Sequence, residues 1–278
     1  MTDLRPPQMN RKLDLYSWWI TAVLIMINVG LFVWQIMHGV DASNPTTADA
    51  IYWGADFAPL TYLEQPARLF TSMFFHFGLI HLMLNMWALY VFGNIAEQLL
   101  GRGYYLSLYI LAGLAGSLLS GYITIRDSYA LLENFDPSLL PHVGAGASGA
   151  VMGLGGALTI LAILPALPRQ RFILDKKALL IIMAINLAFG FMATGINNAA
   201  HIGGMLMGAL LALIWYVGQR FSMSAVAKLV GLATGSVLCY LAYQYCLSLL
   251  APILELWQHI LMQMKSQLNL KAGPLNQD

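Results

Sequence analysis

Long runs of apolar residues alternate with short polar segments along most of this 278-residue chain. A helix that crosses the hydrocarbon core of a bilayer needs about 20 mostly apolar residues. By that criterion the pattern predicts seven membrane-spanning helices. They are expected at residues 18–37, 69–92, 104–123, 148–164, 179–194, 199–217 and 229–250. The fourth and fifth are short for a span, so the fourth is expected to begin below the membrane surface, under a depression that admits water.

The composition supports this interpretation. Hydrophobic residues make up 59% of the chain and charged residues only 10%, whereas a soluble domain carries about 25% charged residues. The formal net charge of +1 argues against a nucleic-acid partner. The predicted fold class is therefore all-α, a polytopic membrane helical bundle, and the lipid bilayer is its expected surroundings.

Basic residues in the linkers predict the orientation of the chain. In the seven-span arrangement, ten of the 14 Lys and Arg residues fall on the side of the N-terminus, and the positive-inside rule places that side in the cytoplasm. The expected organisation is a cytoplasmic tail (1–17), a six-span core (18–217), a linker with the seventh span (218–250) and an external tail (251–278). Apolar residues recur at helical spacing over 253–268, which predicts an amphipathic helix on the external surface.

Ser148 and His201 are the first candidates for chemistry. Each lies in a glycine-rich apolar segment, where a hydroxyl or an imidazole is costly unless it has a partner. The predicted topology places both near the outer ends of their spans, at similar depth. A serine nucleophile needs an adjacent base, and neutral histidine is the usual one. Two structural alternatives stay open, a small packing residue for Ser148 and a hydrogen-bonded polar residue for His201.

Glycines beside both residues favour close packing of their helices. Small residues spaced four apart allow helices to approach closely in membranes. The glycines expected to pack at the site are Gly146, Gly149, Gly204 and Gly208. If these faces meet, the Ser148 hydroxyl and the His201 imidazole come within hydrogen-bonding reach.

His81 and Asn85 form a second constellation on the second predicted span. They are four residues apart and share a helix face, so their donors suit the oxyanion of an acyl-transfer intermediate. Hydrogen bonding between helices is the alternative role. A metal site of His76, His81 and His201 is disfavoured, because the sequence has no His-Glu-x-x-His motif and no nearby carboxylate. No metal or cofactor is expected.

Glu97 lies just past residue 92, at the cytoplasmic end of the second predicted span. It is too far from the outer end of the bundle to orient His201, so the sequence predicts a Ser-His dyad rather than a triad. Glu97 is instead expected to cap or brace the inner end of its own helix.

Three separated motifs, in order, resemble those of the rhomboid intramembrane serine proteases over roughly residues 15–217. Gly146-Ala147-Ser148-Gly149 resembles the family's nucleophile motif. Ala200-His201-x-Gly203-Gly204-x-x-x-Gly208 resembles its general-base helix, and His81-x-x-x-Asn85 its oxyanion helix, with Glu97 matching a structural acid. The seventh span is similar to the six-plus-one architecture of some bacterial members. Two positions depart from the family pattern, Ala67 in place of a Trp and Met152 in place of an aromatic that stacks on the base histidine.

The resemblance implies a six-helix core with a water-filled cavity that opens outward. Ser148 would attack a peptide bond near the external end of a substrate's transmembrane segment, with His201 as base and then acid. The Ser148 N–H, His81 and Asn85 would hold the oxyanion. It also implies single-span or polytopic membrane proteins as substrates, and a bacterial inner membrane with the active site on the periplasmic side.

Two other function classes compete with the protease. A non-catalytic rhomboid-like protein that binds membrane segments would be expected to lack Ser148 or His201, and both are present. A transporter with a histidine proton relay would be expected to carry acidic partners inside its spans and a two-fold internal repeat. The sequence shows neither feature.

Overall fold

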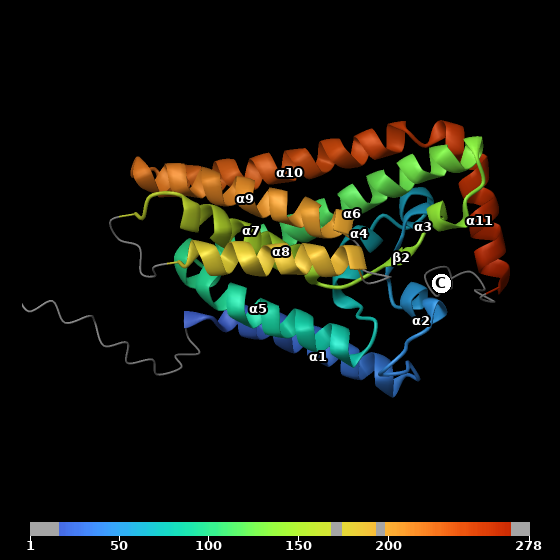
Figure 1. Cartoon of the computed structure of the whole chain (residues 1–278), viewed down its shortest axis with the longest axis horizontal. Helices are drawn as coiled ribbons and strands as arrows, with labels where there is room; N and C mark the ends of the chain where they lie inside the picture. The colour runs from blue at the N-terminus through green and yellow to red at the C-terminus, as the bar shows by residue number, and fades with distance from the viewer. Residues whose placement is uncertain (1–16, 168–173, 193–197, 268–278) are drawn as a thin grey trace, which may run out of the picture.

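Long helices lie side by side along one axis of the molecule (Figure 1). The computed structural model describes residues 17–167, 174–192 and 198–267. In this part of the chain the long helices are α1 (Trp19–Met37), α5 (Leu79–Leu100), α6 (Arg102–Glu133), α7 (Ser148–Ile163), α8 (Lys176–Met192), α9 (Asn198–Arg220) and α10 (Ser224–Ser248). All but α7 and α8 are long and apolar enough to cross a membrane, and α7 is a shorter apolar helix. The predicted all-α polytopic bundle is therefore confirmed. Residues 1–16 and 268–278 of the two predicted tails, and 193–194 of the fifth predicted span, lie outside the described residues.

The short elements gather at one end of the bundle. They comprise α2 (Thr47–Tyr52), α3 (Ala58–Leu63), α4 (Arg68–Thr71), the 3₁₀ turns η2 (Ser72–Phe74), η3 (Pro137–Leu139) and η4 (Ala251–Ile253), the strands β1 (Asp56–Phe57) and β2 (Val143–Gly144), and α11 (Leu254–Gln267). In Figure 1, α11 crosses this end of the molecule. It occupies the segment for which an amphipathic helix was predicted.

The predicted second span was wrong at both ends. Residues 68–74 form α4 and η2, and the spanning helix α5 runs from Leu79 to Leu100. Gly78 determines where it starts, because its φ of +91° suits glycine and a Cβ there would lie 2.6 Å from the Ser43 carbonyl oxygen. Hydropathy does not detect such a turn, because the residues before Gly78 are as apolar as those after it.

The helix α6 continues ten residues past the end of the predicted third span, from residue 123 to Glu133. Its extra turns continue the buried helix face through Ile125, Ser128 and Leu131. A prediction from apolar length ends the span where polar residues begin. In the structure the helix continues, because its last turns pack against η4, the element that follows α10.

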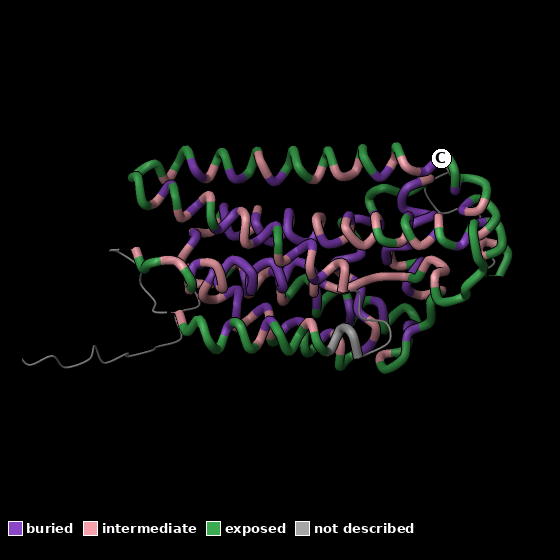
Figure 2. The backbone as a smooth tube through the Cα atoms, turned by 45° about the horizontal axis from the view of Figure 1, so that its top comes forward, coloured by how far each residue is buried: buried purple, intermediate pink, exposed green. Residues whose placement is uncertain are grey.

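Three helices, α6, α7 and α9, form the centre of the bundle through glycine faces. A Cβ on Gly204 would collide with the Gly149 carbonyl, and one on Gly208 with the Gly153 carbonyl. A Cβ on Gly203 would lie 2.6 Å from the Ala115 carbonyl oxygen of α6. These contacts are close enough for backbones to touch, as small-residue interfaces in membranes allow. Figure 2 shows the buried residues concentrated in this centre, whereas α10 is largely exposed.

Glu97 contacts α1, whereas the sequence predicted that it caps its own helix, α5. Its carboxylate accepts hydrogen bonds from the backbone N–H groups of Ile20 (3.1 Å) and Thr21 (2.8 Å), and from the Thr21 hydroxyl (2.8 Å). It therefore caps the N-terminus of α1 rather than its own helix, where a negative charge also suits the helix dipole. The carboxylate thereby ties α5 to α1 at the end of the bundle away from α11.

Trp257 anchors α11 to the end of the bundle. Its side chain is fully buried, and its indole N–H donates to the Ser128 hydroxyl of α6 at 2.8 Å. The Lys265 ammonium forms a salt bridge of 2.7 Å with Glu64, just after α3. The helix therefore holds α6 and the α3 segment in one arrangement.

Replacing Trp257 with alanine should destabilise the protein strongly. Large aromatic-to-alanine changes in a packed core cost about 3–5 kcal/mol, and the Ser128 hydroxyl also loses its partner. The melting temperature in detergent measures the effect. Met262→Ala on the same helix is the matched control, because Met262 is 63% exposed. Equal melting temperatures for the two variants would contradict the anchoring role.

Candidate active site

A tight turn positions Ser148 as the first residue of α7. Gly146 has a φ of +119°, and its N–H donates to the Ser72 carbonyl at 2.8 Å. A Cβ at Gly146 would lie 2.8 Å from Cε1 of His81. Both the backbone angle and the space require glycine here. Gly146 therefore differs from the other three predicted packing glycines, since it lies in the turn before α7 and faces the His81 ring.

A two-residue ladder fixes the chain that enters this turn. In β1 and β2, Asp56 pairs with Gly144 and Phe57 with Val143, antiparallel. The β1 segment is held in turn by Arg68, whose guanidinium donates to the carbonyls of Ile51 and Ala55, both at 2.8 Å. Arg68, next to the position where Ala67 replaces a Trp of the family pattern, thus has a structural role of its own.

Asp56 is a buried acid next to this ladder. The Thr61 hydroxyl donates to its carboxylate at 2.5 Å. Burial raises the pKa of Asp56 to about 6, although the Thr61 hydrogen bond and the Arg68 charge oppose the shift. Because the pKa of Asp56 in the folded state lies above its ordinary value of 3.8, the folded state binds the proton more tightly than the unfolded state. The contribution of Asp56 to the stability of the folded state is therefore greatest below about pH 4, and it is lost as the pH rises to about 6.

Replacing Asp56 with asparagine should remove that pH dependence. The raised pKa corresponds to a loss of roughly 3 kcal/mol of stability between the two pKa values. Melting temperatures of wild type and Asp56→Asn, measured in parallel across this pH range, should diverge as the pH rises, with the variant relatively more stable. A constant difference between the two proteins would contradict the prediction.

His201 lies in the first turn of α9, close to the start of α7. A Cβ on Gly149, which follows Ser148, would lie 3.3 Å from the carbonyl oxygen of Ala200, which precedes His201. Gly116 of α6 meets the same carbonyl, at 2.6 Å from its Cβ position. The chain neighbours of Ser148 and His201 are therefore in contact at one end of the bundle.

The His201 side chain is buried, with 7% of its surface exposed. Among the described residues its Nδ1 has no hydrogen-bond partner. Within the same part of the chain no hydrogen bond joins His201 to Ser148 or to a carboxylate. Hydrogen bonds between catalytic groups are often long before substrate binds. This unpaired nitrogen is itself buried.

The His81 ring projects toward the turn before Ser148. The Phe77 backbone N–H donates to His81 Nδ1 at 3.1 Å, so the neutral ring carries its proton on Nε2. That Nε2 lies 3.0 Å from the Cβ position of Gly146. Asn85, one turn along α5, is buried and donates one amide hydrogen to the His81 carbonyl at 3.0 Å. A second amide hydrogen of Asn85 remains for another acceptor.

His76 also lies in this region. From the sequence it was considered only as a metal ligand, and no role beside Ser148 was predicted for it. It is fully buried, with its ring centroid 5.1 Å from that of His81. The Ala147 N–H donates to His76 Nε2 at 3.4 Å. Burial, and His81 beside it, lower the pKa of His76 to about 3, so the ring is neutral and accepts this bond. A histidine in a loop carries no spacing signal that would have indicated this contact.

In the described part of the chain, no group of three His, Cys, Asp or Glu side chains is arranged to hold a metal. Met152, at the second departure from the family pattern, is buried in α7.

Comparison with known proteins agrees with the motifs and the geometry. The family model of the Rhomboid domain matches residues 63–218, more than half of the chain. The chain belongs to the rhomboid family. The match includes the α5, α6, α7 and α9 helices and therefore the whole candidate site.

Similar proteins include two rhomboid proteases and several RHOMBOID-like proteins. Rhomboid protease AarA of Providencia stuartii is 26% identical over 262 residues, which cover 90% of each chain. Rhomboid protease GluP of Bacillus subtilis is 31% identical over 174 residues, 62% of this chain and 31% of the relative. RHOMBOID-like protein 6, mitochondrial, of Arabidopsis thaliana is 28% identical over 226 residues, 70% of this chain and 68% of the relative.

Proposed function

We propose that this rhomboid protein is an intramembrane serine endopeptidase with a Ser148–His201 dyad. The contact of Gly149 with Ala200 carries the proposal, because it brings the starts of α7 and α9, and with them the two side chains, to one end of the bundle. The similarity to AarA along nearly the whole of both chains supports it.

The proposed reaction is acyl transfer in two steps. The Ser148 hydroxyl attacks the scissile carbonyl while His201 takes its proton, and His201 then gives that proton to the leaving amine. Water, deprotonated by His201, hydrolyses the acyl-enzyme and regenerates Ser148. The unpaired His201 Nδ1 agrees with a dyad, since no carboxylate orients the ring among the described residues.

The proposed oxyanion site uses donors from two segments. The His81 Nε2–H, the free amide hydrogen of Asn85 and the Ser148 N–H would stabilise the charge on the carbonyl oxygen. The Phe77 hydrogen bond supports this role, because it fixes the tautomer in which His81 donates from Nε2.

The proposed substrates are single-span or polytopic membrane proteins, cut near the external end of a transmembrane segment. The excess of basic residues on the N-terminal side supports a cytoplasmic N-terminus and an active site that opens to the external side. The proposed place in a bacterial inner membrane, with the active site facing the periplasm, rests on the similarity to rhomboid proteases of two bacteria.

A fluorophosphonate probe on the solubilised protein tests the nucleophile directly. The wild type should be labelled, and Ser148→Ala should not be. His201→Ala should be labelled far more slowly, because the hydroxyl loses its base. Wild-type protein that is folded but unreactive, and that also fails to cut any membrane substrate, would favour the non-catalytic alternative.

A further inference from the structure

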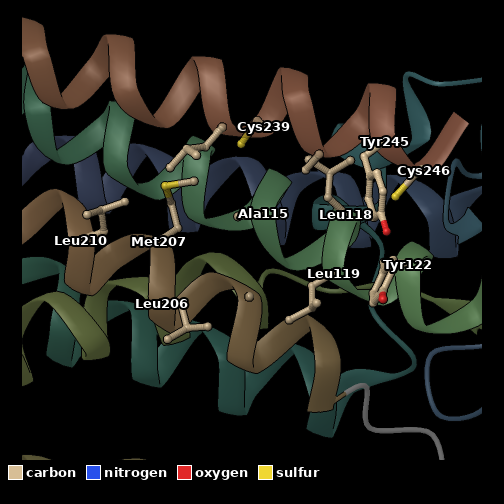
Figure 3. Close-up of a pocket in the computed structure, with 13 residues that line it drawn as sticks. Ala115, Leu118, Leu119, Tyr122, Leu206, Met207, Leu210, Cys239, Tyr245 and Cys246 are labelled. Atoms are coloured by element: carbon tan, nitrogen blue, oxygen red, sulfur yellow. The ribbon is translucent and has the colours of Figure 1, made fainter. Parts of the chain in front are cut away.

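An apolar cavity of about 430 Å³ lies between α6, α9 and α10, apart from the candidate active site. Figure 3 shows its side chains converging from the three helices. They are Ala115, Leu118, Leu119, Tyr122, Gly203, Leu206, Met207, Leu210, Leu238, Cys239, Ala242, Tyr245 and Cys246. The polar atoms among them are two tyrosine hydroxyls and two thiols, which leaves the cavity almost wholly apolar.

The cavity is open at the outer surface of the helical bundle. Leu206, Leu238 and Tyr245 at its rim are 62%, 41% and 55% exposed. The three helices that form it are all long and apolar enough to span the membrane, so its opening faces lipid hydrocarbon. Its volume lies within the range of small-molecule sites, about 300–1,000 Å³. The side chains that line an empty apolar cavity lack dispersion contacts on that side. In a bilayer, the acyl chains of the surrounding lipids are the apolar groups that can supply these contacts.

One end of the cavity is polar in the manner of a membrane interface. Tyr122 and Tyr245 lie there, with ring centroids 6.1 Å apart in a stacked arrangement (Figure 3). One turn further along α6, on the same face as Leu119 and Tyr122, is the exposed Arg126. Tyrosine rings with a basic residue beyond them are typical of the depth at which lipid headgroups lie. An Arg guanidinium is the side chain best suited to a phosphate.

We propose that this cavity binds a phospholipid, with one acyl chain between α6, α9 and α10 and its phosphate at Arg126. The tyrosine pair covers the boundary between chain and headgroup. Gly203 lines the cavity two residues after His201. The acyl chain therefore packs against the helix that carries the candidate base, on a side not used by α7. Lipid binding in this cavity does not require the proposed protease activity.

Native mass spectrometry of the full chain with dioleoyl phosphatidylglycerol in mixed micelles tests the site. Ala242→Phe fills the cavity and should abolish the retained lipid. Leu241→Phe, at the neighbouring residue that is 55% exposed, is the matched control and should retain it. Arg126→Gln should weaken retention about tenfold or more, the loss expected for one charge-assisted hydrogen bond. Lys228→Gln, at the opposite end of α10, should have no effect. Lipid retained by Ala242→Phe as by wild type would overturn the proposal.

The two cysteines of the chain provide a second measurement that needs no cavity-filling variant. Both are free and line the cavity. In the Cys246→Ser variant, phosphatidylglycerol bound in the cavity should cover the Cys239 thiol. The rate of its alkylation by an apolar maleimide should therefore fall about tenfold. Dioleoylglycerol should protect more weakly, and inorganic phosphate should not protect at all. Unchanged alkylation with saturating phospholipid would show that the cavity does not take the acyl chain. Equal protection by dioleoylglycerol and phospholipid would remove Arg126 from the site.

Discussion

Ser148→Ala should abolish peptide-bond cleavage while the protein stays folded. In a soluble serine protease, loss of the nucleophile or of its histidine lowers turnover by roughly 10⁶-fold. We expect a loss of that order for Ser148→Ala and for His201→Ala, and no further loss in the double variant, because the two side chains act as a unit. The measurement is turnover of a transmembrane substrate in proteoliposomes, per folded enzyme.

The matched control for this prediction is Ser107→Ala. Ser107 is a half-buried serine of α6 whose hydroxyl donates to the Gly103 carbonyl of its own helix. This variant should keep wild-type turnover. Ser148 begins α7 without packing a large side chain, so Ser148→Ala should keep the wild-type melting temperature. Near-wild-type turnover in Ser148→Ala would exclude the serine mechanism and leave the rhomboid fold with another function.

The helical bundle could be predicted because bilayer thickness imposes a length on each apolar segment. The structure differs from the predicted bundle at places where a constraint other than bilayer thickness acts. Gly78 starts α5 later than hydropathy indicates, since the turn before it requires a positive φ. The α6 helix extends past the predicted boundary because Ile125 and Leu131 find packing partners beyond the span. Glu97 caps α1 because the two helices meet at that end, which no single-helix argument includes.

The site was less accessible to sequence reasoning than the fold. The predicted membrane topology indicated that Ser148 and His201 lie at similar depth, and the glycine patterns indicated which helix faces were able to meet. The contacts that shape the turn before Ser148 are different. The Gly146 and Ala147 N–H groups donate to the Ser72 carbonyl and to His76. These bonds join segments far apart in the chain, as does the pairing of β1 with β2. Such contacts depend on tertiary structure and leave no periodic signal.

The second large effect is expected at the proposed oxyanion site. Removing one side-chain donor of this kind costs about 10²–10³-fold in turnover in the well-studied soluble case. His81→Ala and Asn85→Ala should each lower turnover more than substrate affinity, by that amount or less, because the Ser148 N–H and the remaining side chain share the charge. The double variant should be slower than either. The donors matter most when negative charge develops, so the ground-state complex should bind almost normally.

Asn85 also bonds to the His81 carbonyl, so a purely structural role makes a different prediction. Under that role, each variant lowers the melting temperature and leaves the turnover of the folded fraction unchanged. Asn85→Gln provides the decisive comparison, because it keeps an amide but moves it by one methylene. It should keep most of the stability and still lose turnover if the amide must meet the oxyanion. Melting temperature and turnover are therefore measured on the same samples. Wild-type turnover in the folded fraction, combined with a lowered melting temperature, would assign both residues to helix packing and remove them from the catalytic site.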